Sequence, residues 1–192
     1  MRKKAEFKPD SAGASLLGRL YLTQRQRQRA LKWFLFAMVC LVLLVLQDVI
    51  FSRVRPWGAT MDLLPGALLL ICVLQGAESG GTFVLAAAVT YYFSGSSPGA
   101  IVVLMLPVLG ILAAAFRQSY LRKGFNSTIL CAGLAVALYE MGIFAVGLLG
   151  GKTIPARLGV FAVTAALSAA VLPVLYPVMQ AIGKIGGETW KD

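Results

Sequence analysis

The stretch SGGTFVLAAAVTYYFSGSSPGAIVVLMLPVLGILAAAF, residues 79–116, runs for 38 positions without a charged side chain. A transmembrane helix needs about 20 apolar residues, so this stretch is too long for a single span. Turn-forming residues at 94–99, SGSSPG, divide it. We therefore predict two short helices at 80–94 and 99–116, and the first is also compatible with a re-entrant segment that depends on its neighbours.

The rest of the chain has the composition of a membrane protein. Of its 192 residues, 58% are hydrophobic and 14% are charged, against about 45–50% and about 25% in soluble domains. Because the apolar runs are continuous and do not alternate with polar residues, they predict helices and not the strands of a barrel. Four further runs are predicted to span the membrane, at 33–51, 63–77, 127–151 and 158–183.

These runs define the predicted fold class and domains. We predict an all-α polytopic membrane protein with a six-helix transmembrane domain at 33–183, a basic tail at 1–32 and a short polar tail at 184–192. Six crossings place both tails on one side of the membrane, which then holds fourteen Lys and Arg residues against four on the other side. The positive-inside rule identifies the richer side as the cytoplasm.

The net charge of +10 comes mainly from the amino-terminal tail, where residues 1–32 carry nine of the eighteen Lys and Arg residues. One interpretation is an amphipathic segment held against anionic lipid of the inner leaflet. The other is a basic tail that only sets the topology. No nucleic-acid-binding motif accompanies the charge, so a nucleic acid is not an expected partner. The candidate lipid-facing residues are Arg19, Arg25, Arg27, Arg29 and Lys32.

The residue types present exclude several activities. The chain has no histidine, which removes Ser-His and Cys-His nucleophilic pairs and the H-E-x-x-H zinc motif. Its three cysteines, Cys40, Cys72 and Cys131, lie in apolar runs and form no C-x-x-C motif. We expect them to be free thiols that pack as small hydrophobic groups. The sequence predicts no catalytic residue, no metal site and no cofactor.

Glu140 lies near the middle of the run at 127–151. An ionised side chain at that depth costs about 2.5–3.5 kcal/mol on insertion scales, so Glu140 is expected to face protein and not lipid. One hypothesis is a binding or coupling carboxyl. The other is an interhelical hydrogen bond that fixes packing.

Three prolines, Pro107, Pro173 and Pro177, fall inside predicted spans. Each removes a backbone donor and bends its helix unless neighbouring groups compensate. They either shape a cavity or are ordinary prolines of membrane helices.

Two acids and two bases surround the first outer connection: Asp48, Arg53, Arg55 and Asp62. One interpretation is a local charge cluster that anchors the helical hairpin. The other is a docking patch for an extracytoplasmic partner.

In the order and spacing of the polar residues within its apolar runs, the chain resembles the rod shape-determining protein MreD family of bacteria from about Leu41 to Lys191. Two departures stand out: Tyr91 lies where the family often has an acid, and Met61 lies where it often has proline. The long basic tail is also unusual for the family. The segments that carry the resemblance are QDVIFS (47–52), GATMDLL (58–64), ESGG (78–81), SGSSPG (94–99) and LYE (138–140).

The resemblance implies a non-enzymatic component of the bacterial inner-membrane machinery that elongates the cell and its peptidoglycan. It implies a fold similar to the substrate-binding subunits of vitamin transporters. The implied partners are MreC, the actin-like MreB, the RodA glycosyltransferase and a class B penicillin-binding protein. Bent helices with grooves of Gly and Ala are expected to accept a partner's membrane span, while Asp62 and the Arg53/Arg55 loop contact it outside. The alternative is the substrate-binding subunit of an energy-coupling-factor vitamin transporter, which has the same size and number of spans.

Overall fold

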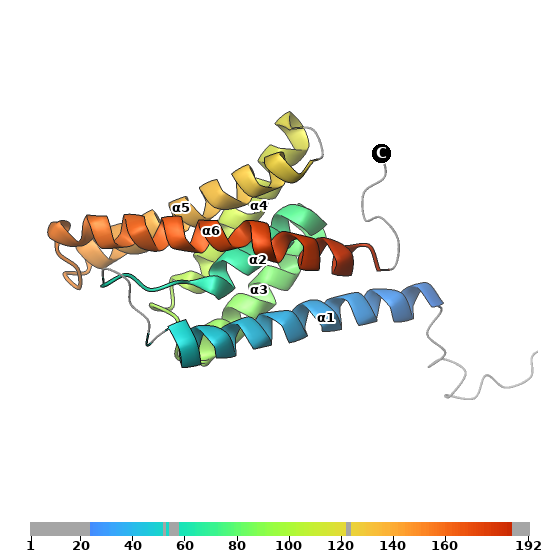
Figure 1. Ribbon diagram of the computed structural model, residues 1–192, viewed down its shortest axis with the longest axis horizontal. Coiled ribbons are helices and arrows are strands. Elements are labelled where there is room, and N and C mark those ends of the chain that lie inside the picture. Colours follow the sequence, from blue (N-terminus) through green and yellow to red (C-terminus); the bar gives the residue numbers. More distant parts are fainter. Residues whose placement is uncertain (1–23, 52, 54–57, 122–123, 186–192) are drawn as a thin grey trace, which may run out of the picture.

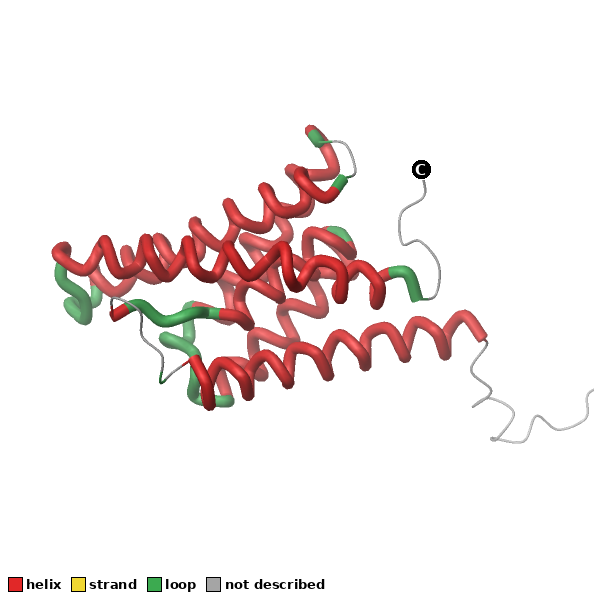
Figure 2. Tube along the Cα trace, viewed as in Figure 1, coloured by secondary structure: helices red, strands yellow, loops and turns green. Residues whose placement is uncertain are grey.

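The computed structural model describes residues 24–51, 53, 58–121 and 124–185, and the regular structure of these residues is entirely helical (Figures 1 and 2). This confirms the all-α class. The elements in chain order are α1 (Gln24–Leu46), the π-helical turn η2 (Gln47–Phe51), α2 (Leu63–Gln75), α3 (Ala77–Phe93), α4 (Val102–Tyr120), α5 (Phe125–Leu149), the 3-10 turn η4 (Pro155–Arg157) and α6 (Leu158–Gly183).

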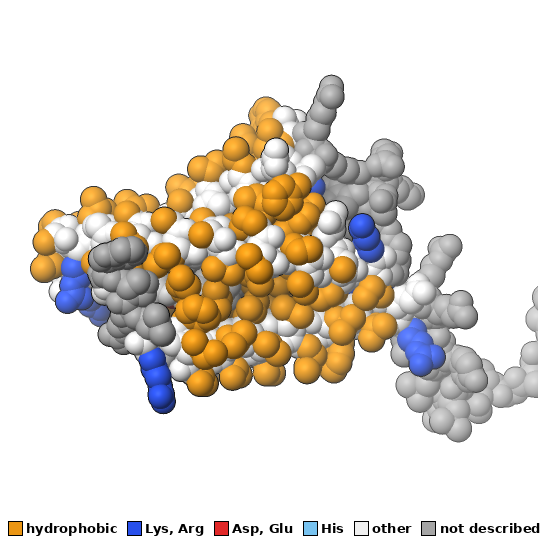
Figure 3. Space-filling model, viewed as in Figure 1, with side chains coloured by type: hydrophobic (Ala, Val, Ile, Leu, Met, Phe, Trp, Pro, Cys, Tyr) orange, Lys and Arg blue, Asp and Glu red, His pale blue; other side chains and the backbone are white. Residues whose placement is uncertain are grey.

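Within the described residues, four helical segments are long and apolar enough to cross a membrane, which confirms a polytopic membrane protein. In Figure 3, hydrophobic side chains cover the middle of the visible face and Lys and Arg side chains lie toward its two ends. Helix α2 has 13 residues and α3 has 17, so both are shorter than a full span of about 20. The four long segments are Gln26–Phe51, Val102–Tyr120, Phe125–Leu149 and Pro155–Gly183.

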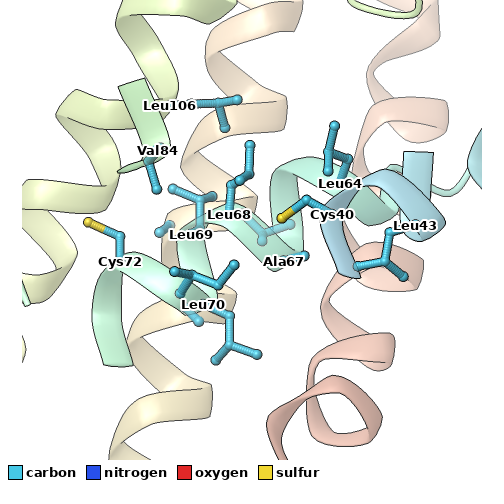
Figure 4. Close-up of a cluster of buried hydrophobic side chains, with 14 of the residues drawn as sticks. Cys40, Leu43, Leu64, Ala67, Leu68, Leu69, Leu70, Cys72, Val84 and Leu106 are labelled. Carbon is cyan, nitrogen blue, oxygen red and sulfur yellow. The ribbon is translucent and has the colours of Figure 1, made fainter. Parts of the chain in front are cut away.

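Helix α2 is the centre of the bundle. Every residue of it except Leu74 is buried, and it packs against all five other α-helices. A helix that is apolar on all sides is stable only when other helices surround it. Figure 4 shows Leu68 and Leu69 of α2 beside Val84 of α3 and Leu106 of α4. Because α2 is enclosed, its short length does not expose its ends to lipid.

The bundle has two ends. Helix α1 begins and α6 ends at one of them, here called the terminal end, and α5 joins α6 at the other, here called the hairpin end (Figure 1). At the terminal end the Lys32 ammonium of α1 donates a hydrogen bond to Gln75 Oε1 at the end of α2, over 2.9 Å. The cytoplasmic side predicted for the terminal end stays a prediction.

The first helix begins before the predicted span at 33–51. Helix α1 begins at Gln24, because Gln, Arg and Ala favour a helix and no stop signal separates residues 24–32 from the apolar run. Lys32 is only 2% exposed, so the prediction that Lys32 faces lipid is wrong. Arg27 and Arg29 are exposed on α1. Arg19 and the side chain of Arg25 lie outside the described part of the chain.

Helix α3 follows α2 with only Gly76 between them. Gly76 has φ of 95°, a left-handed conformation that glycine adopts without a steric penalty. Four residues later, Gly80 lets α3 approach the backbone of α2 closely. A Cβ atom at Gly80 would lie 2.7 Å from the Cα atom of Cys72. Two glycines therefore permit a helical hairpin with no loop.

The substitution Gly80→Ala is expected to destabilise the protein by about 1–3 kcal/mol, because the added methyl group overlaps backbone that cannot move independently. The measurement is thermal unfolding of the purified protein in detergent. Gly133→Ala in α5 is the matched control, since a Cβ there has no neighbour within 4 Å. Equal melting temperatures for the two variants would contradict the close approach.

Candidate functional site

The amino end of α2 lies inside the bundle and not at its surface. Asp62 is the N-cap residue of α2, and its backbone N–H donates a hydrogen bond to Ser168 Oγ in the interior of α6 over 3.0 Å. The preceding Ala59 is fully buried. Non-helical backbone at membrane depth is tolerated where protein surrounds it. Residues 58–62 thus carry the chain inward from the hairpin end before α2 begins.

Two carboxyl side chains meet at this point. Asp62 lies in hydrogen-bonding contact with Glu140 of α5, and Glu140 is only 3% exposed. The hydroxyl-bearing rings of Tyr91 from α3 and Tyr139 from α5 are buried within electrostatic reach of both acids. We call the following residues the interior polar cluster: Gln47, Asp62, Tyr91, Tyr139, Glu140 and Ser168.

Hydrogen bonds from this cluster satisfy two backbone N–H groups at the start of α2. The first four backbone N–H groups of a helix have no partner within the helix. Here Asp62 donates to Ser168, the N–H of Leu64 donates to Gln47 Oε1 over 3.0 Å, and Pro65 has no N–H. Side chains of η2 and α6 thus supply the hydrogen-bond acceptors that water supplies to an exposed helix end.

The same side chains connect α2 to the surface at the hairpin end. Gln47 Nε2 donates to Tyr91 Oη over 3.3 Å, and Tyr91 Oη donates to the carbonyl of Ser96 over 3.3 Å. Ser96 Oγ in turn donates to Asp48 Oδ2 over 2.6 Å. A continuous series of contacts therefore runs from the buried end of α2 to the exposed Asp48.

The opposite end of α2 has cationic partners. Arg117 Nη1 of α4 donates to the carbonyl of Val73 over 2.7 Å, and the Lys32 ammonium binds Gln75. A helix carries partial positive charge at its amino end and partial negative charge at its carboxyl end. Acids at the first end and bases at the second complement this dipole, so the charges of the bundle are arranged along α2.

The predicted outer cluster is divided by the fold. Asp48 and Arg53 are exposed at the hairpin end, whereas Asp62 is half-buried and contacts the buried Glu140, because residues 58–62 run inward. Arg55 lies outside the described residues. The structure thus corrects the expected position of Asp62, and it gives Glu140 an interhelical contact of the kind that the packing hypothesis requires.

The three prolines differ in their surroundings. Pro107 is buried in α4, whereas Pro173 and Pro177 are exposed on α6. The two prolines of α6 therefore do not line an interior cavity.

Four cluster residues were not predicted as site residues: Gln47, Tyr91, Tyr139 and Ser168. Each is an uncharged polar side chain in or beside an apolar run. The signal that finds them is the cost of burying a polar group, which requires a partner for each.

Two apolar grooves also lie on the bundle. One, of about 380 Å³, lies between α1 and α3 and includes Ala37, Ala86, Ala87 and Tyr91 in its lining. The other, of about 510 Å³, lies between α4 and α5 and includes Ala115 in its lining. Small residues in such grooves allow another helix to approach closely in a membrane.

Comparison with known proteins adds no family assignment: no family model, curated protein or solved structure matches this chain. Within the described residues, no group of three or more Cys, Asp or Glu side chains is placed to hold a metal ion. The MreD family therefore stays a resemblance.

The substitution Gln47→Leu is expected to destabilise the protein by about 1–3 kcal/mol, because it leaves the buried N–H of Leu64 without an acceptor. Unfolding in detergent, followed by circular dichroism, measures this loss. Thr82→Val is the control, since that exposed hydroxyl bonds only within its own helix. If Gln47→Leu unfolds like this control, the hydrogen bond does not stabilise α2.

Proposed function

We propose that this chain is a non-enzymatic scaffold of the cell-elongation (rod) complex in the bacterial cytoplasmic membrane, and that it binds MreC. Two observations support the proposal. The order and spacing of the polar residues resemble those of the MreD family from about Leu41 to Lys191. The bundle also carries apolar grooves lined by small side chains, which suit the docking of a membrane span.

The groove between α1 and α3 is the better docking site for MreC. Its lining includes Tyr91 and Ser94, and Tyr91 is connected through Ser96 to the exposed Asp48. This groove thus extends to the hairpin end, where Arg53 is also exposed. A bitopic partner with an extracytoplasmic domain leaves the membrane at that end if the termini of this chain are cytoplasmic.

The groove between α4 and α5 is available to a partner protein other than MreC. Its lining includes Ser119 and Tyr120, near the terminal end, which is the proposed cytoplasmic side. We propose that RodA, the class B penicillin-binding protein and MreB associate with the same assembly. The exposed Arg27 and Arg29 of α1 are proposed to contact anionic lipid.

Ala86→Leu is expected to reduce the amount of MreC that co-purifies with this protein by about tenfold, because the larger side chain fills the α1–α3 groove. Co-expression with MreC and pull-down from detergent extracts measures the effect. Ala115→Leu in the α4–α5 groove is the matched control and is expected to retain MreC. Equal retention by both variants contradicts docking in the α1–α3 groove, and a stoichiometric vitamin in the purified protein would favour the transporter alternative.

The proposed topology predicts opposite labelling of the two ends of the bundle. In intact cells, a membrane-impermeant maleimide is expected to label Lys152→Cys in the α5–α6 connection but not Lys184→Cys after α6. Both lysines are exposed, and the native cysteines are buried. Labelling of Lys184→Cys without permeabilisation would overturn the cytoplasmic placement.

A further inference from the structure

We propose that Asp62 and Glu140 form a binding site for a single proton at the buried amino end of α2. The proton lies between the two carboxyl groups and joins α2 to α5. This property is separate from the docking of a partner, and its test uses the purified chain alone.

The geometry of the pair requires a hydrogen. An ionised carboxylate accepts hydrogen bonds and donates none. The side chains of Asp62 and Glu140 lie in hydrogen-bonding contact, yet Glu140 Oε1 has no donor among the described residues. A proton on either carboxyl converts this contact of two acceptors into a hydrogen bond. Two carboxyl groups that share a site in this way cannot both ionise without strong repulsion.

Among the described residues, no basic side chain faces the pair. In the part of the chain that the structure describes, the titratable side chains that face the pair are Tyr91 from α3 and Tyr139 from α5. Elements η2 and α6 contribute the uncharged Gln47 and Ser168. The buried bases of the described chain, Lys32 and half-buried Arg117, bind the opposite end of α2.

The amino end of α2 limits how much charge the site holds. Its partial positive charge is roughly half an elementary charge, which offsets part of one carboxylate but not two. One shared proton therefore leaves the pair with a single negative charge, which the partial positive charge of the helix end offsets best. The hydroxyl of Tyr139, next to Glu140, also has no hydrogen-bond partner among the described residues. A second unpartnered polar group therefore lies beside the pair.

Loss of the proton would reach the surface through α2. Asp62 and Glu140 would repel each other, and Leu64, two residues after Asp62, would move with the helix end. Leu64 lines the α1–α3 groove and binds Gln47. The site thus makes that groove sensitive to pH, and only this consequence rests on the proposed function.

The first test compares thermal unfolding from about pH 6 to about pH 10 in detergent. The melting temperature of the unmodified protein is expected to fall by at least about 3 °C more than that of Asp62→Asn or Glu140→Gln. In each variant an amide N–H replaces the proton as donor, so the contact survives at high pH. Glu78→Gln, at an exposed acid on α3, is the control and is expected to behave like the unmodified protein.

The second test does not depend on the stability of a variant. Infrared spectroscopy at neutral pH detects the carbonyl stretch of a protonated carboxyl group. We expect this band in the unmodified protein and its loss as the pH rises. Absence of the band at neutral pH would overturn the proposal, as would melting curves with the same pH dependence in all four proteins. Stabilisation by sodium at fixed high pH would assign the pair to a cation and would also overturn it.

Discussion

A helix buried from end to end must find partners for its terminal backbone groups inside the protein, and α2 imposes this constraint on the whole bundle. Its amino end is satisfied by Ser168 and Gln47, and its carboxyl end by Arg117. These side chains come from three different elements, which are thereby fixed relative to one another. The acids at one end and the bases at the other follow the dipole of the same helix. Packing, polarity and charge in this protein are therefore organised around thirteen residues.

Much of the architecture is predictable from the sequence, because the apolar runs are separated by turn signals. The run at 63–77 corresponds to α2 at Leu63–Gln75, and the run at 158–183 coincides with α6. The sequence does not show that α2 begins inside the bundle, because hydropathy measures the length of a run and not its depth. Hydropathy also does not show that α1 begins at Gln24, before the apolar run. Residues 24–32 are polar yet favour a helix, and a boundary drawn from hydropathy ignores that preference.

The site was predictable only in part, and for a physical reason. Glu140 is conspicuous because a charge in the middle of an apolar run is costly. Asp62 is not conspicuous, since an acid just before a helix has the same appearance in sequence whether water or protein surrounds it. Its pairing with Glu140 depends on the inward course of residues 58–62, which no local pattern encodes. Gln47, Tyr91 and Ser168 acquire their roles only through the three-dimensional arrangement.

The loopless junction at Gly76 has a mechanical consequence. Only one residue separates α2 from α3, and their backbones are in contact at Gly80. The two helices therefore cannot move relative to each other and must shift as one rigid unit. Helix α3 forms one wall of the α1–α3 groove, while the opposite end of α2 carries Asp62. A displacement that starts deep in the bundle therefore changes the width of a crevice facing lipid, and a helix wedged in that crevice resists the displacement in turn.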